Sequence, residues 1–241
     1  MDETAPIAEA EVFNRLNGRR RAVRKFDGIP IPDAVLRAIA GEAQLAPSSR
    51  NTQPYRFLCV RSPQLVAALA PFCNDQAAAR SAAALVVVVA GKRLARETLD
   101  AWGRHLAVCE LDERSLAYHR KELRKSRLFL TIGSWPIWSA LVAALQTIQP
   151  AASLLPVGGV GVRHWTSRNA IFAAQTFLLA ASAHGVDTCP MEGFNAVKLR
   201  KALGLPPDVV IPLVIALGHA AADARLEPRW RKPLDEALIL L

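Results

Sequence analysis

The chain lacks the sequence signals of several protein classes. Its four cysteines, Cys59, Cys73, Cys109 and Cys189, form no CxxC pair and show no spacing typical of metal ligands. We therefore expect no disulfide framework and no metal site, and a reducing cytoplasm fits best. The first residues, MDETAPIAEAEVF, carry acidic side chains where an export signal needs a basic start and an apolar core. No export signal is predicted.

Aromatic residues are scarce, at 6%, although the chain is basic, with 30 Lys and Arg against 21 Asp and Glu. The net charge of +9 favours anionic partners. Basic residues gather in three places, near positions 19–25, 114–127 and 225–232. A nucleic-acid binder is expected to add aromatic platforms or a groove-reading helix, and neither accompanies these clusters. A small anionic cofactor is the better prediction, and we expect no nucleic acid.

No GxGxxG motif follows the first predicted strand, which disfavours a dinucleotide-binding Rossmann domain. The glycine-rich piece VGGVGV, at 157–162, precedes a basic and aromatic segment instead of leaving a strand, so we interpret it as a flexible connection. The five histidines are scattered without partners in the sequence. We therefore expect each of them to be a surface or helix-end residue and not a catalyst.

What the chain does have is a regular scaffold with enough apolar residues, 51% of 241, to bury a large core. Strands are predicted at 55–61, 83–90 and 208–218, and helices at 33–45, 62–72, 94–127 and 166–184. The strand at 83–90 reads as fully buried. The last helix is expected to start at Thr166 or Ser167 and to stop at Gly185. Pro212 predicts that the last strand has an edge position or a bulge.

Three stretches carry the features of a binding site. APSSRNTQP, at 46–54, presents hydroxyl and amide groups on a backbone pinned by two prolines, an arrangement suited to a flat polar ligand or a phosphate. RRRAVRKFD, at 19–27, offers guanidinium groups for bidentate contacts. DTCPMEGFN, at 187–195, predicts an extended segment ending in a tight turn, where backbone N–H groups approach a ligand closely. An ordinary turn and a solvated basic patch are the alternatives for the first two stretches, each taken alone.

The order of these motifs resembles one known family. RRAVRKFD, APSSRNTQPYRF, Asn74, GVDTCPMEGF, PLVIALGH and PRWRKP follow one another as in the FMN-dependent nitroreductase family. The resemblance spans nearly the whole chain, and only residues 93–164 lack a clear counterpart. No single motif is specific, but six in the same order are.

The resemblance implies a set of cofactor contacts. Arg20, Arg21 and Arg24 correspond to the basic motif that contacts the FMN phosphate and the pyrimidine side of the flavin ring. Ala22 stands where many members have Ser, so one side-chain hydrogen bond to the cofactor is absent. Arg229 and Arg231 match the closing basic pair on the phosphate.

Further contacts are implied for the ring system. Pro47, Ser48, Ser49 and Asn51 correspond to the loop that reaches the FMN bound mainly by the other subunit. Asn74 matches a residue that hydrogen-bonds the ring, and Pro190, Met191, Glu192 and Gly193 match residues that line its face. The backbone N–H of Glu192 is expected to point at flavin N5, and Arg24 to stabilise negative charge on the reduced ring.

The implied fold is α+β, a three-layer sandwich with a central mixed or antiparallel sheet flanked by helices, in an intertwined homodimer. Residues 1–241 form one domain, with 93–164 as a helical insertion acting as cap or lid and 220–241 extending onto the partner. The implied activity is ping-pong hydride transfer from NADH or NADPH, through FMN, to a nitroaromatic, quinone or related small-molecule acceptor. Dehalogenation, ring dehydrogenation and flavin destruction are same-fold alternatives. A basic protein that binds nucleic acid or membrane surfaces without catalysis is the alternative from another class.

Residues 128–162 contain no charged side chain and follow the basic run RKELRKSR. We interpret this segment as a cap over the active site, with Trp135, Trp138 and Trp165 as apolar walls of the substrate pocket. Peripheral membrane contact of a cytoplasmic protein is the alternative, since the run is apolar and has a basic flank. A true membrane span is disfavoured because Gly133, Pro136 and Gln146 interrupt it.

Overall fold

The computed structural model describes residues 5–132, 140–141, 144–145, 148 and 158–241. Its centre is a sheet of four strands in the order β1-β2-β4-β3. These strands are β1 (Tyr55–Val60), β2 (Ala84–Ala90), β3 (Asp187–Met191) and β4 (Val210–Gly218). Each neighbouring pair is antiparallel. The predicted strands at 55–61, 83–90 and 208–218 are confirmed to within two residues at each end, and β3 is the strand of the DTCPMEGFN stretch.

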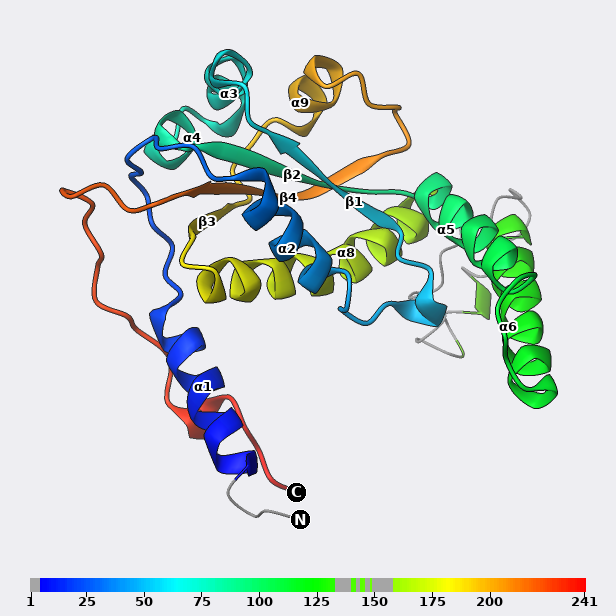
Figure 1. Ribbon diagram of the computed structural model, residues 1–241. Coiled ribbons are helices and arrows are strands. Elements are labelled where there is room, and N and C mark those ends of the chain that lie inside the picture. Colours follow the sequence, from blue (N-terminus) through cyan, green and yellow to red (C-terminus); the bar gives the residue numbers. More distant parts are fainter. Residues whose placement is uncertain (1–4, 133–139, 142–143, 146–147, 149–157) are drawn as a thin grey trace.

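Helices cover both faces of this sheet (Figure 1). On one face lie α2 (Asp33–Ala43) and α8 (Gly158–Ala183), and on the other lie α3 (Pro63–Leu69), α4 (Ala77–Ser81) and α9 (Ala196–Ala202). Side chains of β2 alternate between the two cores: Val86 and Val88 pack with Phe177 of α8, whereas Val87 and Val89 pack on the opposite face. All seven residues of β2 are buried, as predicted. The α+β three-layer architecture is confirmed.

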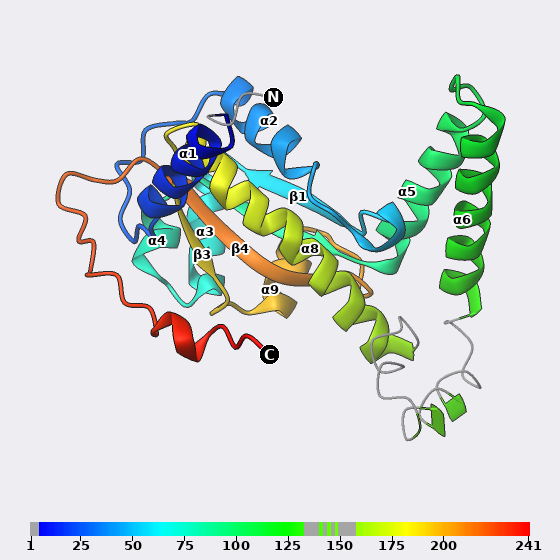
Figure 2. The ribbon, with the colours of Figure 1, turned by 90° about the horizontal axis from the view of Figure 1, so that it is seen from below.

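A helical arm projects from one end of this body (Figure 2). It consists of α5 (Lys92–His105) and α6 (Glu113–Ile132), which pack against each other through Leu99, Leu123 and Leu130. The helical prediction for 94–127 is confirmed for most of its residues, but a turn that was not predicted divides the segment into two helices. The chain turns after Leu106, and Asp112 starts a new helix by accepting a hydrogen bond from Ser115 N (3.0 Å), which is the geometry of an N-cap.

The long helix α8 begins earlier than predicted. Thr166 lies inside it, and the Thr166 hydroxyl donates back to Val162 O (2.9 Å), so neither Thr166 nor Ser167 is its first residue. The interpretation of the glycine-rich piece as a flexible connection was also wrong, because the helix starts at Gly158. A Ser or Thr signals a helix start only when its side chain caps free N–H groups, and here Thr166 bonds within the helix. The predicted stop is confirmed, since α8 ends at Ala183 and Gly185 has φ 74°.

Pro212 lies at a bulge in β4, which is one of the two alternatives predicted for it. The edge position was wrong, because β4 lies between β2 and β3. The register slips opposite Val89: Val88 pairs with Leu213, but Ala90 pairs with Val210. The extra residue on β4 accommodates a proline that has no N–H to give to the ladder.

Two segments leave the body together at the end opposite the arm (Figure 1). One is α1 (Ala5–Arg19), a helix that the sequence analysis did not predict. The other is the C-terminal segment, with a short 3-10 helix at Leu234–Glu236. None of the helices, within the described part of the chain, is both long and apolar enough to cross a membrane. Most of 128–162, the alternative site of membrane contact, lies outside the described residues.

Candidate functional site

The basic segment after α1 is fixed along the outer edge of β3. Val23 N donates to Thr188 O (3.0 Å), and Ala22 and Thr188 form an isolated parallel bridge. Val23 and Phe26 are buried in the core, and Phe26 N donates to Ser81 Oγ (3.0 Å). Because the buried residues anchor this segment, the arginines between and before them are held at the surface of a rigid strand-like piece.

The C-terminal segment returns to the same place. Arg229 donates to the carbonyl oxygens of Asn17 (3.2 Å), Gly18 (2.9 Å) and Arg20 (2.5 Å), which lie at and beyond the end of α1. A cation is stabilising there because the last carbonyls of a helix have no partner within it. Arg21 in turn donates to Glu227 O. These contacts join the two ends of the chain around one site.

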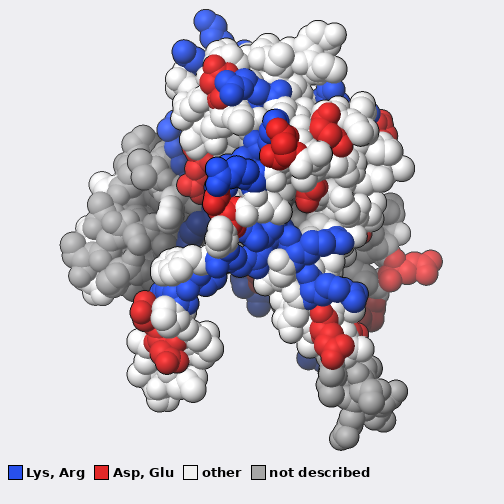
Figure 3. Space-filling view, turned by 90° about the vertical axis from the view of Figure 1, so that its left-hand side faces the viewer, with Lys and Arg blue, Asp and Glu red and all other residues white. Residues whose placement is uncertain are grey.

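An open pocket of about 310 Å³ lies at this junction. The residues lining it are Arg20, Arg21, Ala22, Arg24, Pro190, Leu226, Glu227, Pro228, Arg229, Trp230 and Arg231. Figure 3 shows basic side chains gathered where the two extensions leave the body. Seven of the predicted cofactor contacts, six of them from the two ends of the chain and the seventh Pro190 of β3, therefore meet in one pocket, which we call the arginine pocket.

The positive charges in the arginine pocket oppose one another. Burial lowers the pKa of the Arg20 guanidinium, and the charges of Arg229, Arg231 and Arg21 lower it further. Glu227 is the acidic residue among those lining the pocket, and its carboxylate pairs with Arg225 (3.2 Å). A bound anion would relieve this repulsion, and guanidinium groups match the oxygens of a phosphate bidentately. The donor set therefore fits the phosphate of FMN.

The predicted ring-binding residues Pro190, Met191, Glu192 and Gly193, here called the PMEG turn, lie beside this pocket. Pro190 lines the pocket, on an edge strand where a missing N–H leaves no ladder bond unmade. The Thr188 carbonyl points away from β4 and accepts from Val23 N. Backbone groups alternate in direction along a strand, so the backbone of Pro190 also points away from β4. Glu192 and Gly193 are exposed directly after the strand, whereas the Met191 side chain is 2% exposed in the core. The Met191 side chain therefore lies in the core and does not line the pocket.

Asn74 lies against the same turn. It has a left-handed backbone, φ 53°, and its Nδ2 lies 3.2 Å from the position that a Cβ on Gly193 would take. Gln76 donates from Nε2 to Gly193 O (2.9 Å) and to Cys73 O (3.0 Å), which fixes the turn relative to Asn74. The close approach explains the glycine at 193. Asn74, the PMEG turn and the arginine pocket form one continuous region of the molecule.

The predicted loop Pro47, Ser48, Ser49 and Asn51 is not part of this region within one chain. It lies beside the first half of α8, where Ser49 N donates to Asn169 Oδ1 (2.6 Å). β3, by contrast, follows the far end of α8. A second pocket of about 440 Å³ adjoins the loop, lined by Ser49, His164, Ser167, Arg168, Asn169, Ile171 and Phe172. Ile171 and Phe172 expose large apolar side chains in the single chain.

The three tryptophans predicted as walls of the substrate pocket are placed as follows. Trp165 is 6% exposed and packs with Leu99, Leu123 and Leu130 in the core of the arm. A tryptophan next to a basic run gives no sequence signal that separates these two placements. Trp135 and Trp138 lie outside the described residues.

Sequence reasoning missed several residues of these sites. Gln76 was passed over although it stands two positions after Asn74, and this proximity was the available signal. Asn169 gave no signal, because a single polar residue within an apolar helix pattern reads as a surface position. Trp230, which lines the arginine pocket, stood within the quoted motif PRWRKP. The described residues contain no group of three or more His, Cys, Asp or Glu able to hold a metal ion.

Comparison with known proteins identifies the family. Residues 18–219 match the model of the nitroreductase family, and the chain therefore belongs to the nitroreductase family. A relative named NADH dehydrogenase, from Thermus thermophilus, is 28% identical over 239 residues, 99% of each chain. Family membership and this relative together support an oxidoreductase.

Solved structures share the fold. A candidate nitroreductase from Bacillus subtilis superposes with a TM-score of 0.77 at 23% identity, covering 96% of this chain and 100% of that one. A candidate nitroreductase from Exiguobacterium sibiricum, solved in complex with FMN, has a TM-score of 0.69 at 24% identity and covers 95% and 97% of the two chains. At these identities the likeness shows the nitroreductase fold.

Proposed function

We propose that this protein is an FMN-dependent NAD(P)H oxidoreductase that reduces nitroaromatic, quinone or related electron-poor acceptors. The observation that carries the proposal is the arginine pocket, which lies directly beside the PMEG turn at the free edge of β3. The positive charge of the arginine pocket matches a dianionic phosphate. The backbone donors of the PMEG turn match a flat polar ring joined to that phosphate. The FMN complex of the Exiguobacterium sibiricum protein supports the choice of cofactor.

Each part of the site has a role in this proposal. Arg20, Arg21, Arg229 and Arg231 hold the phosphate, and Arg24 offsets negative charge on the ring. Asn74 and the backbone of Pro190–Gly193 bind the ring, with the N–H of Glu192 donating to N5. When bound, FMN would supply the hydride chemistry between reduced nicotinamide and the acceptor. The protein therefore contributes binding, orientation and charge stabilisation, not a proton-transferring side chain.

We also propose that the site is completed by a second copy of the chain. The loop Ser48–Asn51 lies beside Asn169 in the first half of α8, whereas the arginine pocket lies beside β3, which follows the other end of α8, so one chain does not close both around one ligand. The exposed Phe172 on α8 and the apolar tail Leu238–Leu241 are surfaces that an isolated chain leaves in water. Packing of α8 against its symmetry mate, with 220–241 crossing to the partner, accounts for both.

The insertion at 93–164, which contains nearly all of the arm, is proposed as a cap that governs access of the acceptor. Its α5 and α6 have their own core, separate from the two cores of the sheet. Deletion of residues 130–160 is therefore expected to change the preference among acceptors while FMN stays bound. Loss of FMN from this variant would show a role in folding instead.

The colour of the purified protein tests the proposed function. FMN bound at one equivalent per chain gives a yellow protein whose visible absorbance bleaches anaerobically on addition of NADH or NADPH. Reoxidation by a panel of nitroaromatics, quinones and halogenated phenols then ranks the acceptors. A colourless protein that does not take up added FMN would overturn the proposal, and binding to DNA or vesicles by such a protein would favour the basic non-enzymatic alternative.

A further inference from the structure

The loop after α2 has an unusual backbone. Arg50 and Asn51 have φ 52° each, and Gln53 has φ 36°. Residues other than glycine adopt this left-handed region at a cost in free energy, and such residues persist only where their surroundings hold them. Three of them fall within four positions of the segment Ser48–Gln53, here called the left-handed loop.

Asn169 is the residue of α8 that holds this loop. Its side-chain oxygen accepts from Ser49 N (2.6 Å), and its side-chain nitrogen donates to Trp165 O (2.8 Å). The residue is 3% exposed, so neither bond is exchanged readily for a bond to water. The second bond fixes the direction of the amide, because Trp165 O lies one turn back on the same helix. The acceptor is therefore presented to Ser49 in one orientation.

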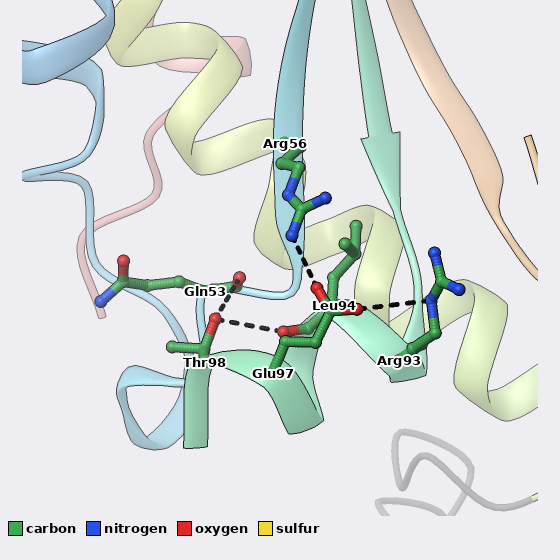
Figure 4. Close-up of polar contacts among 6 residues, drawn as sticks. All are labelled: Gln53, Arg56, Arg93, Leu94, Glu97 and Thr98. Atoms are coloured by element: carbon green, nitrogen blue, oxygen red, sulfur yellow. Dashed lines mark hydrogen bonds and ion pairs between the residues drawn. The ribbon is translucent and has the colours of Figure 1, made fainter. Parts of the chain in front are cut away.

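Other contacts close the ends of the left-handed loop. Ser48 Oγ accepts from Gln53 N (3.1 Å), which ties the first residue to the last. Thr98 of α5 donates to Gln53 O (3.3 Å), as Figure 4 shows, and α5 is itself joined to β1 by the pair of Arg56 and Glu97 (2.6 Å). The Arg50 guanidinium lies 5.5 Å from the centre of the Phe129 ring of α6. The loop is thus held from the arm on one side and from α8, through Asn169, on the other.

We propose that Asn169 is a positioning residue, which keeps the left-handed loop in the one conformation that can meet the flavin of the partner subunit. The effect on FMN rests on the proposed function, but the effect on the loop does not. Without the Asn169 oxygen, the Ser49 N–H loses the acceptor that α8 provides, and that hydrogen bond no longer offsets the strain of the loop. The loop then populates other conformations, and FMN pays the ordering cost when it binds.

Two substitutions separate this role from general stability. Asn169→Leu removes both hydrogen bonds and keeps the number and branching of the side-chain heavy atoms. Thr166→Val is the matched control: Thr166 is 0% exposed on the same helix, and its hydroxyl bonds to carbonyl oxygens of the preceding turn, not to the loop. Asn169→Asp keeps an oxygen that accepts from Ser49 N and loses the donor to Trp165 O, whose helical bond from the 169 backbone remains.

The first readout is amide hydrogen exchange of residues 48–53 in the FMN-free protein. Asn169→Leu is expected to speed exchange there by about tenfold, the effect of removing one hydrogen bond that holds the loop. Thr166→Val is expected to leave these amides unchanged, and Asn169→Asp to restore most of the protection. Equal exchange in Asn169→Leu and the wild-type protein would overturn the proposal, whatever the protein does with flavin.

The second readout is the dissociation constant of FMN from fluorescence titration. Asn169→Leu is expected to weaken binding on the order of tenfold, in line with the loss of loop order, and Thr166→Val to leave it within about twofold. If the loop loosens but FMN affinity is unchanged, the positioning role for the cofactor is contradicted. If the wild-type protein takes up no FMN, the proposed function fails, while the exchange experiment still decides whether Asn169 holds the loop.

Discussion

The two regions that we propose to bind the flavin, one beside each half of α8, are held in place in different ways. At the end nearest β3, the arginine pocket assembles cations from both ends of the chain and fixes them through carbonyl groups, as Arg229 does with Asn17, Gly18 and Arg20. At the other end, the left-handed loop is short, local and held by neutral hydrogen bonds. The arginine pocket therefore suits a charged group, and the left-handed loop suits a group that is recognised by its shape. In the proposed dimer one flavin meets both, its phosphate at the first and its ring at the second.

Removing charge should produce the largest effect. The double variant Arg20→Ala and Arg231→Ala is expected to weaken FMN binding by roughly a hundredfold or more, because each arginine supplies charge-assisted hydrogen bonds to the phosphate. Riboflavin, which lacks the phosphate, should lose much less. Stability of the FMN-free protein should not fall, because the neighbouring arginines that lower the pKa of Arg20 also repel it. Titration of both ligands and thermal unfolding measure these effects.

Arg225→Ala is the control for that variant. Arg225 lies in the same C-terminal segment and pairs with Glu227, but it does not line the arginine pocket. Its removal should leave the affinity for FMN nearly unchanged. An equal loss in the control and the double variant would mean that net charge, not the pocket, attracts the flavin.

A substitution below the pocket should have an intermediate effect. A Cβ at Gly218 would lie 2.8 Å from Phe26, whose buried side chain anchors the basic segment. Gly218→Ala is expected to destabilise the fold by ~1–3 kcal/mol through overpacking, measured by urea unfolding. FMN affinity should fall with it, since the arginines move with Phe26. Unchanged stability would show that the segment shifts freely, contrary to a pocket held in place by its anchors.

Changing the shape of the loop should have the smallest effect. Ser48→Ala removes the acceptor of Gln53 N. The loss of this one hydrogen bond is expected to lower the stability of the loop conformation by ~1 kcal/mol. Because the loop is assigned to the ring, the affinities for FMN and riboflavin should fall by the same factor. A loss confined to FMN would place this loop near the phosphate and remove the distinction between the two ends.

The sheet and its helices were predictable where the pattern was local. The buried run at 83–90 and the glycine after α8 gave their elements directly. The start of α8 was missed because Thr166 imitates a cap, and the turn before Asp112 was missed because charged helical residues flank it on both sides. Both errors depend on which backbone group a side-chain oxygen contacts, and the spacing of residue types in the sequence does not show this.

The arginine pocket was predictable only through the order of motifs. Composition gave the three basic clusters, but nothing in the spacing brings Arg20 to Arg231; the resemblance to the family did, and the structure places both in one pocket. Asn169 and Gln76 were beyond reach for another reason. They act on backbone groups of residues distant in the sequence, and such contacts exist only after folding.

Subunit mixing tests the shared site most directly. One parent carries Arg20→Ala and Arg231→Ala, and the other carries Ser48→Ala and Asn169→Leu, so that each homodimer has two impaired sites. After unfolding and refolding together at equal amounts, half of the dimers are mixed, and in each the intact loop meets the intact arginine pocket once. The account predicts recovery of tight FMN binding at roughly a quarter of all sites. If the mixture binds no more FMN than its parents, the two ends of α8 do not serve one flavin across a dimer.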